Sequence, residues 1–248
     1  PRRARPVHRD TPYPARLMDI GIIGIYNNLG PAAAAAFLFW GIFSITMHEL
    51  AHGWAALSQG DDTPRIYGRM TPNPVVHMGW VSLILLALTG IAWGMMPVDP
   101  SKFRWGRRGR IIVSGAGPAM NVVLWLLCWG GPGLMLRDGI ATNGSLLRAI
   151  RALPEGTEYQ LALFLLIGGG LNGMLALFNM LPLPPFDGAS VLAGFSRTYY
   201  RWMHNPRIAS AGFFIVLIAM FSGVGGVMGR WADRMGVDLA SWVGRLGG

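Results

Sequence analysis

The sequence predicts an all-α polytopic membrane protein, and three observations support this fold class. Hydrophobic residues make up 52% of the 248 residues and charged residues only 13%, whereas about a quarter of a soluble domain is charged. Apolar runs that are long enough to cross a bilayer recur along the chain. The polar stretches between them reach only about 30 residues, which is too short for an additional soluble domain.

The charge balance favours a membrane partner over nucleic acid. The net charge of +9 comes from 20 arginines and one lysine against 12 acidic residues. The basic residues cluster at 2–16 and 102–110, beside apolar segments, where they set topology and meet anionic lipid headgroups. We therefore expect anionic lipids at these basic segments and no nucleic acid. Cys128 is the only cysteine, which excludes an internal disulfide and a zinc site built from cysteines.

The first part of the chain leads into a spanning helix. Residues 1–30 are expected to form a basic N-terminal arm and a short interfacial segment, because four prolines and five arginines precede residue 17. The first spanning helix begins at Pro31, where proline is favoured, and ends before Gly60. Residues 61–78 mix proline, glycine, asparagine and aspartate, which predicts either an irregular linker or a small membrane-associated β hairpin.

The remaining segments are mostly apolar. Residues 79–96 form an apolar segment of 18 residues with three glycines, which is marginal for a span and equally compatible with a re-entrant segment. The C-terminal residues 230–248 have the pattern of an amphipathic segment. The transmembrane domain is thus expected to cover residues 31–229, with its core in residues 31–188. Further spanning helices are predicted over residues 111–136, 159–181 and 207–229.

The first spanning helix carries a candidate metal-binding motif. His48 and His52 stand four positions apart, on one face of the helix, with Glu49 between them. This spacing is suited to two imidazoles on one zinc ion, with a carboxylate beside the bound water. The preceding residues, 32–47, are almost purely apolar, and ionisable groups in such a helix are costly unless they have a function. The alternative is a pair of packed histidines that contact a nearby acid.

A hydrolytic zinc site needs a third protein ligand and an open position for water. Glutamate occurs only at positions 49, 155 and 158, and Ser58 stands where an extended motif would need a third histidine. Asp187 follows a spanning helix, in a stretch from 179 to 188 with three prolines and a glycine. Irregular backbone at membrane depth is tolerated where it lines a cavity. Asp187 is therefore the preferred third ligand, and an ordinary Asp-Gly turn is the alternative.

Residues 31–188 resemble the site-2 proteases, intramembrane zinc metalloproteases of peptidase family M50. The resemblance rests on His-Glu-Leu-Ala-His at 48–52, on Gly-Pro-Ala-Met-Asn at 117–121, and on the stretch from 179 to 188. Gly-Arg-Met-Thr-Pro-Asn-Pro at 68–74 is similar to the compact bacterial branch of this family. The expected fold is therefore a site-2-protease-like transmembrane helical core with a re-entrant segment.

The resemblance implies roles for individual residues. His48, His52 and Asp187 would bind one Zn²⁺ per chain, and Glu49 would act as general base. Asn179 would help to position the substrate backbone or the developing oxyanion. The implied activity is that of an intramembrane zinc endopeptidase, which hydrolyses peptide bonds in or near transmembrane segments of membrane-protein substrates. The implied location is the bacterial cytoplasmic (inner) membrane.

Topology gives a further expectation, because ligands of one metal must reach the same depth. The two histidines lie near the exit end of their helix, and Asp187 follows the exit end of its own. A crossing by residues 79–96 would place these ligands on opposite faces, so we predict that this segment is re-entrant. Residues 97–110 and 182–206 then share one side, which the positive-inside rule makes cytoplasmic. The active site would lie nearer that face, although the same rule favours the opposite side for the basic arm.

Two functions of other classes remain open at this stage. One is a catalytically silent scaffold subunit that stabilises partners in a larger membrane complex. The other is a metal transporter, which would need further ligands along a path across the bundle, and only His77 and Asn172 are available for that role. His77 either lines the active site or is a polar histidine at the membrane interface.

Overall fold

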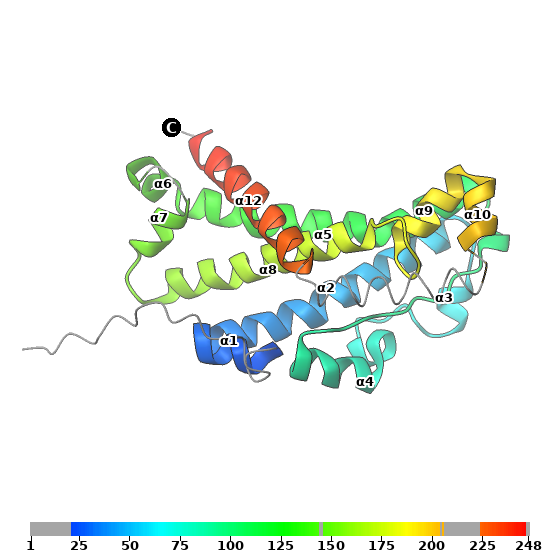
Figure 1. Cartoon of the computed structure of the whole chain (residues 1–248), viewed down its shortest axis with the longest axis horizontal. Coiled ribbons are helices and arrows are strands. Elements are labelled where there is room, and N and C mark those ends of the chain that lie inside the picture. Colours follow the sequence, from blue (N-terminus) through cyan, green and yellow to red (C-terminus); the bar gives the residue numbers. More distant parts are fainter. Residues whose placement is uncertain (1–20, 144–145, 204, 206–223, 247–248) are drawn as a thin grey trace, which may run out of the picture.

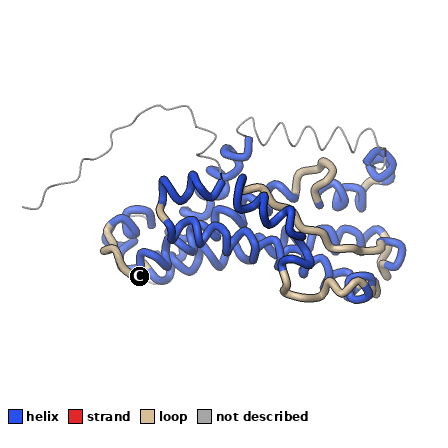
Figure 2. Tube along the Cα trace, turned by 90° about the horizontal axis from the view of Figure 1, so that it is seen from below, coloured by secondary structure: helices blue, strands red, loops and turns tan. Residues whose placement is uncertain are grey.

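The computed structural model describes residues 21–143, 146–203, 205 and 224–246. These residues form helices and loops, with no strand in the part of the chain that is described (Figure 2). In the described part of the chain, three helices are long and apolar enough to cross a membrane: α2 (Pro31–Ser58), α5 (Arg107–Met135) and α8 (Thr157–Asn179). The prediction of an all-α polytopic membrane protein is confirmed at this level.

The three long helices pack side by side along the long axis of the molecule (Figure 1). α2 and α8 run in one direction and α5 runs in the other, so α2 and α8 end where α5 begins. Polar residues lie inside this bundle: Asn121 and Asn172 are fully buried, whereas Val123 and Leu127 are exposed on the outer surface. Buried polar and outward apolar side chains suit helices that are surrounded by lipid.

Local sequence signals explain where the long helices start and stop. α2 begins with Pro31, and a left-handed Gly60 with φ of 89° follows its end, as expected for a glycine after a helix. α5 begins at Arg107, four residues before the predicted start at residue 111, because the basic stretch 107–110 is also helical. α8 covers residues 157–179 rather than 159–181, since Pro182 and the prolines after it oppose a further helical turn.

Short helices fill the connections between the long ones, so the prediction of a β hairpin in residues 61–78 is wrong. Asp61 accepts the backbone N–H of Thr63 at 3.0 Å, and Pro64 occupies the first turn of a helix. Both features favour a helix start over strand pairing. The short elements are α1 (Gly21–Leu29), α3 (Thr63–Ile66), the 3-10 helix Pro100–Lys102, α6 (Arg137–Asn143), α7 (Leu146–Arg151), α9 (Asp187–Phe195) and α10 (Arg197–Met203).

The apolar segment after residue 78 folds back on itself. It belongs to α4 (Pro74–Thr89), which has a kink at Gly79 and ends at a left-handed Gly90. The chain then returns in an extended conformation beside α4: Met95 donates its backbone N–H to the carbonyl of His77 at 3.0 Å. Both ends of the segment therefore lie toward the same end of the bundle (Figure 1), which is the shape that a re-entrant segment requires.

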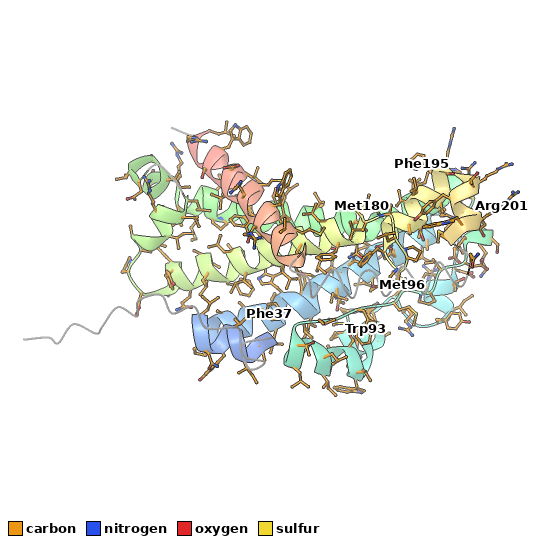
Figure 3. The ribbon with its side chains drawn as sticks, viewed as in Figure 1. Phe37, Trp93, Met96, Met180, Phe195 and Arg201 are labelled. Carbon is orange, nitrogen blue, oxygen red and sulfur yellow. The ribbon has the colours of Figure 1, made fainter. Side chains whose placement is uncertain are left out.

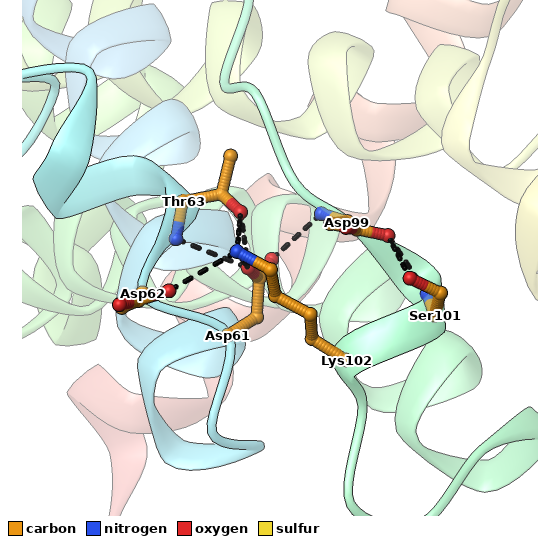
Figure 4. Close-up of polar contacts among 6 residues, drawn as sticks. All are labelled: Asp61, Asp62, Thr63, Asp99, Ser101 and Lys102. Carbon is orange, nitrogen blue, oxygen red and sulfur yellow. Dashed lines mark hydrogen bonds and ion pairs between the residues drawn. The ribbon is translucent and has the colours of Figure 1, made fainter.

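A cluster of polar side chains ties the end of this returning segment to the end of α2 (Figure 4). The side chain of Asp61 is fully buried and accepts the backbone N–H of Asp99 at 2.7 Å. The ammonium group of Lys102 lies 3.9 Å from this carboxylate and 3.1 Å from that of Asp62. The extended residues 91–98 are thus anchored at one end by α4 and at the other by Asp61.

The C-terminal helix α12 (Val224–Arg245) packs across α5 and α8. Ala240 of this helix joins a buried cluster that includes Trp129 and Ile140. The amphipathic segment predicted for residues 230–248 is therefore part of a helix that contacts the bundle. The predicted span over residues 207–229 and the arm at residues 1–20 lie mostly or wholly outside the described residues. The predicted domain boundaries stay predictions.

Candidate metal centre

Three side chains from two distant parts of the chain meet inside the bundle. His48 and His52 face the same side of α2, and their Nε2 atoms are 3.0 Å apart. The Oδ2 atom of Asp187, the first residue of α9, lies 3.1 Å from Nε2 of His48 and 3.4 Å from Nε2 of His52. Both histidines are buried and Asp187 is half-buried. The structure thus brings together the three residues that the sequence nominates as metal ligands.

The far side of each imidazole is held by an oxygen atom. Nδ1 of His52 lies 2.7 Å from the carbonyl oxygen of Val113. Nδ1 of His48 lies 2.6 Å from Oδ1 of Asn121. These oxygens can only accept a hydrogen bond, so each Nδ1 carries a hydrogen and each neutral imidazole presents the lone pair of its Nε2 atom to the cluster.

A chain of amide groups sets the orientation of Asn121. Its Nδ2 atom donates to Oδ1 of Asn172 at 2.9 Å, and Nδ2 of Asn172 donates to the carbonyl of Gly168 at 2.9 Å. Because the Gly168 carbonyl can only accept, both amides have one favoured orientation. In the sequence, Asn121 stands out only as the last residue of the motif at 117–121, which does not reveal this connection to His48.

The donor set fits a zinc ion. Two imidazole nitrogens and a carboxylate oxygen converge at 3.0 to 3.4 Å from one another. In a tetrahedral zinc site with bonds of about 2.0–2.1 Å, neighbouring ligand atoms are about 3.3 Å apart. Three acceptors at these distances repel one another without a proton or cation between them. The cluster therefore has the ligand types and spacing of a zinc site with three protein ligands.

A glycine of α5 creates the space for this cluster. A methyl group on the backbone of Gly117 would overlap the Nε2 atoms of both His48 and His52. Gly115, two positions earlier on the same helix, has open space at its Cβ position. The close approach of α5 to the two imidazoles therefore depends on the missing side chain at position 117.

Glu49 lies between the cluster and the returning extended segment. Its side chain is buried, and it makes no hydrogen bond with any described residue. Gly94 packs directly against its carboxylate, so that a side chain at position 94 would overlap Oε1. Gly94 was not among the site residues predicted from the sequence. The available signal was a glycine within an otherwise apolar stretch, which often marks close backbone approach.

Two other nominated residues lie outside the cluster. Asn179, at the end of α8, donates its side-chain amide to the carbonyl of Leu175 at 3.0 Å, and its role toward substrate stays a prediction. His77 is buried in α4, with its Nε2 atom 2.7 Å from the carbonyl oxygen of Thr71, and its Nδ1 atom has no hydrogen-bond partner among the described residues. Burial lowers the pKa of His77, which favours the neutral imidazole.

Apolar spanning helices that enclose a His-His-Asp cluster beside a glutamate define the class of integral membrane proteins with a zinc-hydrolase site. The model of peptidase family M50 matches residues 33–223. The chain therefore belongs to peptidase family M50, the family that its sequence motifs resemble. It is a zinc metalloprotease of this family with helices that cross a membrane.

Two bacterial relatives agree with this family. YwhC of Bacillus subtilis, named as a zinc metalloprotease, is 32% identical over 185 residues, which cover 74% of this chain and 79% of that protein. Rip2 of Mycolicibacterium smegmatis, also named as a zinc metalloprotease, is 28% identical over 157 residues, which cover 61% of this chain and 53% of that protein. No solved structure matches the chain.

Proposed function

We propose that this protein is an intramembrane zinc endopeptidase that hydrolyses peptide bonds in or near transmembrane segments of other membrane proteins. The observation that carries this proposal is the convergence of His48, His52 and Asp187 beside Glu49, within a bundle of apolar helices. The three clustered residues would hold one Zn²⁺ per chain. Membership of peptidase family M50 supports the same activity.

The side chains around the cluster have different roles in the proposed reaction. A zinc ion bound there would polarise the scissile carbonyl and favour ionisation of the attacking water. Glu49 accepts a proton from that water and returns it to the leaving amine. Asn121 and Val113 hold the two imidazoles in the orientation that ligation needs. The buried setting strengthens these electrostatic interactions, because little solvent screens them.

The extended segment, residues 91–98, has a backbone edge that could hold the substrate. The backbone N–H groups of Trp93 and Met95 donate to α4. Those of Ala92, Gly94 and Met96 make no hydrogen bond within the described part of the chain. One edge of the segment is thus available to an unwound substrate strand, which could pair with it through backbone hydrogen bonds.

The bacterial relatives support a location at the cytoplasmic membrane of a bacterium, and the distribution of basic residues supports a site nearer the cytoplasmic face. Residues 102–110 and 197–201 carry most of the arginines around this end of the bundle. They lie at the end where α2 finishes and α9 begins (Figure 1). Basic segments next to spanning helices favour the cytoplasmic side. Fractionation of the host cell, with protease accessibility of a tag after residue 205, tests this orientation.

Metal content is the first test of the proposed zinc site. The detergent-purified wild type should contain about one zinc per chain, measured by mass spectrometry of the metal. Asp187→Ala should lose zinc or bind it at least about tenfold more weakly, because it removes one of three ligands. Absence of zinc from the wild type, after growth with added metal, would favour the scaffold function.

Cleavage is the second test. Wild type and Glu49→Gln are reconstituted in nanodiscs with a panel of labelled single-span membrane proteins. The wild type should cleave one or more of them within or beside the span, and Glu49→Gln should retain zinc but lose about 10²-fold or more of the rate, because it cannot accept the proton. Equal cleavage by the two proteins would contradict the role of Glu49.

A further inference from the structure

A small cavity lies where the beginning of α5 meets the helices that follow Asp187. It has a volume of about 210 Å³. Three of its five lining residues are arginines, and they come from two helices that are far apart in the sequence. The lining residues are Arg107, Arg110, Ala193, Arg197 and Tyr200.

The three arginines of this cavity have no carboxylate partner in the part of the chain that the structure describes. Every ion pair found there involves a histidine or Lys102. The guanidinium group of Arg110 lies 4.9 Å from the centre of the Tyr200 ring, in a cation–π contact that restrains it. Like charges that converge without a counterion repel one another. The cavity therefore presents unneutralised positive charge to a ligand.

The chemistry of the lining selects the class of ligand. Guanidinium groups bind phosphate oxygens through paired, charge-assisted hydrogen bonds. Three guanidinium groups suit a phosphate group better than an apolar ligand, because only an anion compensates their charge.

The position of the cavity indicates where the phosphate comes from. Arg107 is the first residue of a spanning helix, so the cavity lies at one end of the apolar bundle. Exposed aromatic side chains surround this end, namely Trp105, Phe195 and Trp202, and Figure 3 shows Phe195 and Arg201 there on α9 and α10. Mixed aromatic and basic side chains are typical of the membrane–water interface, where lipid phosphates lie.

We propose that the cavity formed by Arg107, Arg110, Arg197 and Tyr200 binds the phosphate group of an anionic lipid headgroup. The site is separate from the metal centre and does not depend on catalysis. It also gives a specific place to the anionic lipids that the basic segment at 102–110 predicts. Gly194 of α9 packs against Ile111 of α5 beside this cavity. A headgroup bound to Arg110 and Arg197 would bridge α5 and α10.

The test measures lipid binding to the full chain by native mass spectrometry from detergent, with phosphatidylglycerol or phosphatidylcholine added. The wild type should retain one phosphatidylglycerol in preference to phosphatidylcholine. Arg110→Gln and Arg197→Gln should each weaken that binding about tenfold, as expected for loss of a charged hydrogen bond. Arg108→Gln is the matched control, because Arg108 is exposed on the same helix but does not line the cavity.

Three results would overturn the proposal. Equal weakening by Arg108→Gln would indicate diffuse surface charge instead of a site. Equal retention of the two lipids would remove the requirement for an anionic headgroup. Binding of inorganic phosphate alone, with the same dependence on Arg110 and Arg197, would assign the cavity to a free phosphate. Because Arg197 is exposed on α10, its variant tests the site even if Arg110→Gln disturbs the packing on Tyr200.

Discussion

Nδ1 of His48 lies 2.6 Å from Oδ1 of Asn121, and this contact connects the candidate metal centre to a buried chain of amides. The chain passes from Asn121 on α5 to Asn172 on α8 and ends at the carbonyl of Gly168. All three long helices therefore contribute to the orientation of one imidazole. The polar groups in the middle of this apolar bundle have a shared role in preparing His48 for ligation.

Loss of the acceptor at position 121 should weaken zinc binding. Asn121→Leu keeps a similar volume but leaves His48 without its partner, so we expect zinc affinity to fall about 10- to 100-fold. Competition with a zinc chelator measures this affinity. Asn121→Asp keeps an acceptor for His48 and should bind zinc more tightly than Asn121→Leu. Equal affinity in the wild type and Asn121→Leu would show that the contact does not support ligation.

A methyl group at position 117 should exclude the metal. Gly117→Ala places its Cβ against the Nε2 atoms of both histidines, so zinc content should fall to a small fraction of that of the wild type. Gly115→Ala is the matched control, because its Cβ meets open space on the same helix. Both proteins are purified in parallel and their metal content is measured. Normal zinc content in Gly117→Ala would contradict the observed approach of α5.

A side chain at position 94 should impair catalysis without removing zinc. Gly94→Ala would push against the carboxylate of Glu49 and displace either that group or the extended segment. A misplaced proton acceptor should cost about 10²-fold in cleavage rate, while the three metal ligands remain in place. Zinc content and the cleavage rate of a reconstituted substrate are compared with those of the wild type. Cleavage at the rate of the wild type would exclude a tight contact here.

Removal of the Asp61 carboxylate should destabilise the fold far more than removal of its neighbour. Asp61→Ala leaves the half-buried N–H groups of Thr63 and Asp99 without their acceptor, at a cost of about 2–4 kcal/mol in the free energy of unfolding. Asp62→Ala removes only an exposed ion pair with Lys102, which is worth about 0–1 kcal/mol. Thermal unfolding in detergent compares the two variants. Equal shifts would contradict the anchoring role of Asp61.

Acid should destabilise the protein partly through His77. Its pKa is lower in the folded chain than in the unfolded chain, because burial disfavours the charged imidazole. The folded state therefore binds fewer protons, and stability falls as the pH drops below about 6.5. The unfolding temperature should drop more between about pH 7.5 and about pH 5.5 in the wild type than in His77→Gln. An equal drop in both proteins would exclude this contribution.

Much of the helical framework could be predicted from local sequence. The length of each apolar run and the positions of proline and glycine define the three long helices to within four residues at their ends. Residues 61–78 were harder to predict, because proline, glycine and aspartate occur in both hairpin turns and helix starts. The buried side chain of Asp61 supports the helical outcome, and its burial depends on the returning segment around Asp99.

The candidate site was only partly predictable. The spacing of His48, Glu49 and His52 is a local property, since any helix places positions 48 and 52 on one face. Asp187 was nominated by elimination, and its place beside the histidines depends on how α9 follows α8. The contacts of Gly94 and Gly117 carry no local signal of their target. A glycine indicates that space is needed, but not which group occupies it.

The sequence by itself determined the membrane class, the order of the helices and the pair of histidines, because these follow from composition and helical period. Only the tertiary structure decided which oxygen holds each imidazole, which backbone passes over Glu49, and where the arginines of the basic cavity meet. These features join residues as far apart as His48 and Asp187, which are separated by 139 positions. Contacts of that range depend on the packing of whole helices, which local sequence patterns do not specify.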